Sequence, residues 1–267
     1  LPHEFKGDVN TGDLGNLKQD DVLKDAVTED GNLDFGKVNA GKEEKGEDKI
    51  DIFEIHGSIT HTYSGTGEPF VNTMGGADLA IRGNSDGEAT NAPVFTVTGG
   101  TYEIVDAGNV TFDGNVSVSG DAADNRGKLH IDNVANDGVA MFKAKDGVQG
   151  NANGAVLEVG KNADVVVTGK VDITQTNGNV AVSVGKGSTV AIGGGLIGAK
   201  DNTDKDVAIV VGKGGDIAIN REGENIKREG DCRDCLRVLS LTSKGFVKGG
   251  KITFRSKLFL CVFGSCE

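Results

Sequence analysis

The fold is decided by a repeat in the second half of the chain, which reads Ala155-Val-Leu-Glu-Val-Gly-Lys161, Val180-Ala-Val-Ser-Val-Gly-Lys186 and Val207-Ala-Ile-Val-Val-Gly-Lys213. The tripeptide Val-Gly-Lys recurs after 25 and then 27 residues, and a second short apolar stretch follows each copy. A period of about 25 residues with short strands and glycine turns is typical of one coil of a β-solenoid. A β-sandwich would not place the same tripeptide at the same point of every unit.

Short stretches with apolar residues at every second position extend this pattern from about residue 50 to residue 220. Examples are Val110/Phe112, Val116/Val118 and Leu129/Ile131, and Gly or Asp follows each of them within two residues. Such alternation indicates strands that bury one face. No helical period of useful length interrupts them, which excludes a doubly wound α/β fold. The sequence therefore predicts an all-β solenoid over residues 50–220.

The composition of the 267 residues agrees with a solenoid of narrow coils. Hydrophobic residues make up 37% of the chain, whereas there are 2 tyrosines and no tryptophan, so we expect a core of thin β-branched layers without a major aromatic part. Of the 42 glycines, 36 lie before residue 221, where we expect them to supply the positive φ angles of the coil corners. The net charge of −12 argues against a nucleic-acid partner. No apolar run approaches the roughly 18 residues that would span a membrane.

Charge and residue usage divide the chain into three regions. Residues 1–49 carry 13 acids and 7 lysines with isolated apolar positions. We expect an acidic leader there that is short, partly helical or disordered, and loosely attached. Residues 50–220 form the predicted solenoid. Residues 221–267 form an atypical basic tail with 10 Lys and Arg against 6 Asp and Glu, and they hold all four cysteines.

The solenoid region resembles the passenger regions of bacterial autotransporters (type V secretion). The likeness rests on the Val-Gly-Lys coils and on Gly108-Asn-Val-Thr-Phe-Asp-Gly-Asn-Val-Ser-Val-Ser-Gly120, and it covers roughly residues 50–220. It implies a right-handed parallel β-helix that is exported and displayed as an adhesin, toxin scaffold or self-associating factor. The chain differs from that family because it has no signal peptide and no C-terminal β-barrel, so we expect it to be a mature or truncated piece.

The lysines of the repeat are the candidate binding residues of the solenoid. Stacked coils would place Lys161, Lys186 and Lys213 in one row at a turn, which is either a surface for an anionic glycan or lipid or a set of solubilising turn residues. Asp164 and Asp216 would partly neutralise this row, which favours the second interpretation.

The sequence indicates no catalytic, cofactor-binding or metal site in the solenoid. His56 and His61 lie five residues apart, which puts their side chains on opposite faces of an extended segment and disfavours a shared metal. His130 lies between the apolar residues Leu129 and Ile131, so the alternation along the strand predicts that its side chain points outward. We expect no nucleophile elbow in the solenoid, that is, no turn from a strand into a helix that carries a nucleophilic serine. Surfaces that bind sugars usually offer aromatic side chains, and the chain has no tryptophan and only the tyrosines Tyr63 and Tyr102, which disfavours glycan processing.

The four cysteines of the tail leave three interpretations open. Their spacing is C-x₂-C-x₂₅-C-x₄-C. They could form disulfides in a capping tail, they could hold a zinc ion as thiolates, or the tail could be foreign sequence that begins near Arg221. The residues concerned are Cys232, Cys235, Cys261 and Cys266.

These observations predict a non-catalytic β-helical adhesin or self-association passenger, a virulence-type protein that is secreted or displayed at the bacterial cell surface outside the outer membrane. Its expected partner is a host or bacterial surface protein or glycan, or a second copy, met by an extended face. We expect no cofactor, no nucleic-acid partner and no membrane-spanning segment in this chain. The alternative is a β-helix polysaccharide lyase or glycoside hydrolase that acts on an anionic glycan. A third hypothesis is an intracellular binding module that depends on zinc.

Overall fold

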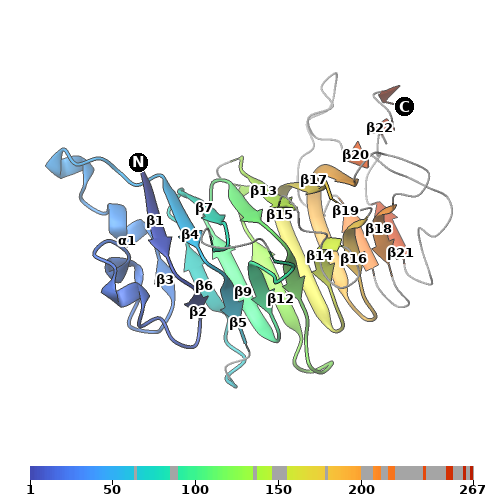
Figure 1. The fold of residues 1–267 in the computed structure, drawn as a ribbon, viewed down its shortest axis with the longest axis horizontal. Helices are drawn as coiled ribbons and strands as arrows, with labels where there is room; N and C mark the ends of the chain where they lie inside the picture. The colour runs from blue at the N-terminus through green and yellow to red at the C-terminus, as the bar shows by residue number, and fades with distance from the viewer. Residues whose placement is uncertain are drawn as a thin grey trace.

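The chain is built mainly of strands with very few helices, and nearly all of the strand pairs are parallel and are stacked in a solenoid-like arrangement (Figure 1). This computed structural model describes residues 1–62, 65–84, 90–134, 137–145, 155–177 and 180–199, and beyond these only the backbone of the strands. Each strand from β1 to β12 pairs with the third strand after it in the chain, so that one coil consists of three strands. The structure bears out the strand-rich, mostly parallel part of the predicted fold, and the right-handed β-helix stays a prediction.

The strands form three faces, which we number by their order within a coil. The first face contains β1 (Pro2–Lys6), β4 (Ile52–His56), β7 (Asp78–Ile81), β10 (Val110–Asp113), β13 (Val139–Lys143) and the second half of β15 (Ala163–Gln175). The second face contains β2 (Val9–Asn10), β5 (Ile59–His61), β8 (Phe95–Val97), β11 (Val116–Val118), β14 (Ala155–Val159), β16 (Val180–Val184) and β18 (Val207–Val211). The third face contains β3 (Leu33–Asp34), β6 (Phe70–Thr73), β9 (Gly100–Val105), β12 (Gly127–Ile131) and the first half of β15.

Two long strands turn the corner from the third face to the first. β15 pairs with β12 through its first half and with β13 through its second half. β17 (Thr189–Ala199) continues both halves in the next coil. The first and third faces are therefore joined into one curled sheet, and the second face is a separate sheet.

Residues 1–49 form the first coil of the stack, and the prediction of a loosely attached leader is wrong. β1 pairs with β4 over five residues, β2 pairs with β5, and β3 pairs with β6. The segment between β2 and β3 contains two short 3₁₀ helices, η1 (Leu17–Gln19) and η2 (Leu23–Ala26), in the region that we predicted to be partly helical or disordered. The only α-helix among the described residues, α1 (Gly36–Asn39), follows β3, and the 3₁₀ helix η3 (Glu43–Lys45) follows α1.

The same segment covers the N-terminal end of the core. Figure 1 shows η1, η2 and α1 beyond the first coil, at the end of the stack. Leu14, Leu17, Leu23 and Ala26 are buried in the common hydrophobic core, and the ring of Phe35 packs 4.3 Å from that of Phe53 in β4. A terminal coil needs such a cover because its open end would otherwise expose apolar side chains.

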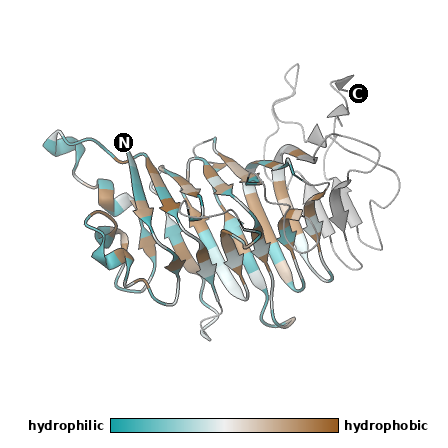
Figure 2. Ribbon diagram, viewed as in Figure 1, coloured by the Kyte–Doolittle hydropathy of each residue, from teal (hydrophilic) through white to brown (hydrophobic). Residues whose placement is uncertain are grey.

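The core differs between the two halves of the stack. Its N-terminal half is aromatic, against our expectation of thin β-branched layers, because Tyr102, Phe95, Phe112 and Phe142 are fully buried and in contact. From β14 onward the buried hydrophobic side chains of the described residues are Val, Leu, Ile and Ala, as expected. Figure 2 shows hydrophobic and hydrophilic residues alternating along the strands, which matches one inward and one outward face.

Glycines such as Gly83, Gly100 and Gly187 have the positive φ angles that we expected, whereas other corner glycines are required by close backbone approach. A Cβ atom on Gly57 would lie 2.0 Å from the carbonyl oxygen of Gly7 in the first coil. A Cβ atom on Gly138 would lie 2.2 Å from the carbonyl oxygen of Gly108. Left-handed corners are also formed without glycine, by Asp106, Asp137 and Asn162. Glycine therefore allows consecutive coils to stack closely at these corners.

Two strands of the basic tail extend the stack. β20 (Arg237–Val238) pairs with β17, and β21 (Lys251–Phe254) pairs with β19 (Asp216–Ile219), in both cases in parallel. β22 (Cys261–Val262) and β23 (Ser265–Cys266) pair antiparallel, with Cys261 opposite Cys266. The side chains of all four cysteines lie outside the described residues, so their role stays a prediction.

Candidate functional site

The outward side chains of the second face form one continuous row. Strand pairing aligns one residue per coil in the order Asn10, Thr60, Thr96, Ser117, Glu158 and Ser183. All but one of these side chains are uncharged, and neighbouring strands lie about 4.8 Å apart. Burial of Glu158 raises the pKa of its carboxyl group. The row is thus a narrow polar surface of mostly short side chains that runs along the stack.

The predicted lysine row is present in part. Lys161 and Lys186 are exposed at the same corner of consecutive coils, and the N–H of Asn162 donates to the carbonyl oxygen of Lys186. Lys213 lies outside the described residues. The sequence predicted that Asp164 would neutralise this row, but Asp164 is paired with Arg126, which sequence reasoning did not consider.

Arg126 connects three consecutive coils. Its Nε and Nη2 atoms donate to both carboxylate oxygens of Asp164 at 2.8 and 2.7 Å, and Nη2 also donates to the carbonyl oxygen of Gly187 at 2.9 Å. Burial opposes ionisation of Asp164, but the hydrogen bonds from Arg126 and Thr189 prevail and lower its pKa. A bidentate pair of this kind fixes its geometry as well as its charge. We interpret Arg126 as a structural clamp.

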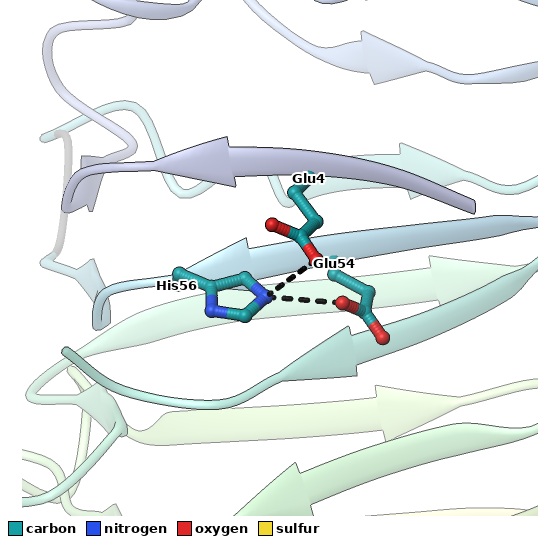
Figure 3. A group of neighbouring side chains, drawn as sticks. All are labelled: Glu4, Glu54 and His56. Carbon is teal, nitrogen blue, oxygen red and sulfur yellow. Dashed lines mark hydrogen bonds and ion pairs between the residues drawn. The ribbon is translucent and has the colours of Figure 1, made fainter. Parts of the chain in front are cut away.

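A second polar network crosses the first face (Figure 3). β1 and β4 pair so that Glu4 lies directly opposite Glu54, and alternation puts Glu54 and His56 on the same side of β4. The Nε2 atom of His56 lies 3.0 Å from Oε2 of Glu54 and 4.0 Å from Oε1 of Glu4. The ligand atoms of these three residues all lie within 4.8 Å of one another. They are the one group of three or more potential metal ligands found among the described residues.

Arg82 holds the other oxygen of Glu54. Its Nη2 and Nε atoms donate to Oε1 at 3.1 and 3.3 Å, and its Nη1 atom lies 3.7 Å from Asp113 on the next strand of the first face. The hydrogen bond to His56 lowers the pKa of Glu54, burial raises it, and Arg82 lowers it further, with a net decrease. Glu54 is therefore ionised, and its Oε2 atom faces the imidazole of His56.

His56 and His61 are separated by the fold, as their spacing predicted. His56 faces outward on the first face, whereas His61 is buried, with 4% of its surface exposed. The Nδ1 atom of His61 lies 2.7 Å from Oγ1 of Thr11, and its ring lies about 6 Å from those of Phe70 and Tyr102. Burial lowers the pKa of His61 to about 4. His61 is thus a neutral core residue at neutral pH.

The third face carries a smaller version of the first-face contact. His130 points outward from β12, as the alternation predicted, and its Nδ1 atom lies 3.9 Å from Oε1 of Glu103 on β9. The register of β12 and β9 places the carboxylate of Glu103 directly beside His130. The pair therefore gives a natural reference for the histidine with two carboxylates on the first face.

A polar pocket of about 600 Å³ lies where the first coil meets β5. The pocket is lined by Asp8, Val9, Asn10, Asp13, Gly15, Asn16, Gln19, Ser58 and Thr60. The carboxylate of Asp8 accepts hydrogen bonds from the N–H and the hydroxyl of Ser58, which fixes it to the second coil. The lining offers amides, hydroxyls and carboxylates without a lysine, arginine or histidine.

Comparison with known proteins adds no relative to these observations. No protein-family model, no curated protein and no solved structure matches the chain. Within the part of the chain that the structure describes, we found no helix that is long and apolar enough to cross a membrane.

Proposed function

We propose that this chain is a non-catalytic passenger, secreted or displayed at a bacterial cell surface, that acts by adhesion or self-association. In this proposal the solenoid is a right-handed parallel β-helix like the autotransporter passengers that its coils resemble, in line with the strong preference of parallel crossovers for that hand. The observation that carries the proposal is the unbroken register of the second-face row from Asn10 to Ser183. Such a row offers a partner a long, even surface.

The second-face row supports recognition along the stack. Its hydroxyl and amide groups can donate and accept hydrogen bonds with little loss of side-chain entropy, because Ser and Thr are short. Five steps of strand spacing separate Asn10 from Ser183, so the row is about 24 Å long. A surface protein, a glycan or a second copy could lie along this length.

The alternative, a lyase or hydrolase for anionic polysaccharides, has less support. That chemistry needs a general acid or base and a cation near the substrate's carboxylate. The pocket at the first coil contributes Asp8 and Asp13, but no lysine or arginine lines it. Arg126 and Asp164, which have the right chemistry, are bound to each other.

Beads coated with the purified chain would test the proposal. We expect coated beads to cluster with one another or to bind cells and glycans. The double variant Ser117→Arg/Ser183→Arg should reduce this clustering or binding at least about ten-fold, because two bulky charged side chains would keep the partner away from the second-face row. The matched control is Thr111→Arg/Thr174→Arg, which changes two hydroxyl residues in the same coils on the first face.

Three results bear on the proposal in different ways. Clustering that both double variants reduce equally would contradict the assignment to the second face. Beads that neither cluster nor bind would overturn adhesion and self-association together. Release of shortened or unsaturated sugars from an anionic polysaccharide would favour the enzyme instead.

A further inference from the structure

We propose that Glu4, Glu54 and His56 form a surface site for a divalent transition-metal ion such as Zn²⁺. This inference goes beyond adhesion or self-association and does not depend on it. The donor set consists of one imidazole nitrogen and two carboxylates, which is a combination that zinc accepts with three protein ligands and one open position. Figure 3 shows all three ligand atoms converging on one point above β1 and β4.

The backbone fixes two of the three ligands. Glu54 and His56 are two residues apart on β4, and each side chain is only 16% exposed, so both are held against the first face. Their ligand atoms, Oε2 and Nε2, are 3.0 Å apart. Two ligands at about 2.0 to 2.2 Å from a tetrahedral zinc ion lie about 3.4 Å from each other. A small opening of this pair is enough to admit the ion.

Glu4 supplies the adjustable ligand. Its side chain is 53% exposed, and its Oε1 atom lies 4.0 Å from Nε2 of His56. The register of β1 and β4 places Glu4 directly beside Glu54. A rotation of this solvent-facing side chain therefore brings its carboxylate to the ion without movement of the backbone.

Charged neighbours complete the site. Arg82 binds the far oxygen of Glu54, which leaves Oε2 free to face His56, and such outer contacts orient metal-binding carboxylates. The charge of Arg82 is balanced by Asp113. Lys6, which pairs with His56 in the strand register, adds one exposed positive charge nearby. With Arg82 offset by Asp113, the two carboxylates and Lys6 leave a net negative charge around the ion, which favours a divalent cation.

Titration of the full chain with zinc chloride, followed by calorimetry, tests the site. The cysteines are alkylated first, because Cys232, Cys235, Cys261 and Cys266 could themselves bind zinc. We expect one ion per chain and a thermal unfolding temperature that rises with zinc concentration. His56→Ala should abolish this binding, and Glu4→Gln should weaken it at least about ten-fold, as the loss of even an outer partner does.

His130→Ala is the matched control, because His130 also faces a carboxylate across a strand pair, that of Glu103, but lies outside the group of three potential metal ligands found among the described residues. We expect this variant to bind zinc like the unchanged chain. With Co²⁺ in place of zinc, the absorption spectrum should show nitrogen and oxygen ligation that disappears in His56→Ala. The site would be disproved by an alkylated chain that binds no zinc, by unchanged binding in His56→Ala and Glu4→Gln, or by an equal loss in His130→Ala.

Discussion

Replacement of Phe112 by alanine is expected to lower the free energy of unfolding by about 4 kcal/mol. Phe112 is fully buried, and its ring centre lies 5.2 Å from that of Phe95 and 4.7 Å from that of Phe142, in neighbouring coils. Truncation of a buried phenylalanine to alanine costs about 3 to 5 kcal/mol, because contacts are lost and a cavity remains. Urea unfolding, monitored by circular dichroism, measures the change.

Thr111→Ala is the control for this core substitution. Thr111 precedes Phe112 on β10 and faces outward, so its loss should change the free energy of unfolding by less than about 0.5 kcal/mol. If Phe112→Ala were as mild as Thr111→Ala, the aromatic stack of the N-terminal coils would not be the core of the fold.

Acid is expected to weaken the fold through His61. The pKa of His61 is about 4 in the folded chain, below the value of about 6.5 in an unfolded one. The unfolded chain therefore binds the proton first, and stability that is fully present above about pH 6.5 is lost as the pH falls toward 4. Between about pH 7 and about pH 4.5 we therefore expect the free energy of unfolding to fall by about 2 kcal/mol.

His61→Asn separates this effect from general acid unfolding. Asparagine cannot titrate, yet its side-chain oxygen can still accept a hydrogen bond from Thr11, as Nδ1 of His61 can. Denaturant unfolding at about pH 7 and about pH 4.5 should show a smaller difference in the variant, by about 2 kcal/mol. An equal pH dependence in both proteins would mean that His61 does not carry the proton.

The sequence predicted the parts of the fold in which the repeat is regular. The Val-Gly-Lys copies mark β14, β16 and β18, and these strands do pair in register. Alternating apolar residues likewise located β10, β11 and β12. In these coils each strand is followed closely by a turn, so the period is visible in the sequence.

The first coil was missed because its period is hidden. β2 and β3 have only two residues each, and residues 11–32 lie between them. Alternation over two residues carries no signal, and the charge of residues 1–49 suggested solvation. The aromatic core was missed for another reason, since only its position in successive coils brings Phe95, Tyr102 and Phe112 together.

The first-face cluster could be predicted only in part. The spacing Glu54-Ile-His56 does place two polar side chains on the same side of a strand, which is a readable signal. The third member, Glu4, is 50 residues away, and only the pairing of β1 with β4 brings it near. Because we expected residues 1–49 to be a loosely attached leader, there was no reason from the sequence to place Glu4 beside Glu54 and His56.

The distance between Asn10 and Ser183 tests most directly whether the whole chain from its first strands is one stack of parallel coils. Nitroxide labels on cysteines at these two positions, with the four native cysteines replaced by serine, would report it by double electron–electron resonance. The aligned row predicts a single narrow distribution near five strand spacings, about 24 Å between backbones. A broad distribution, or one centred far from this value, would contradict the account.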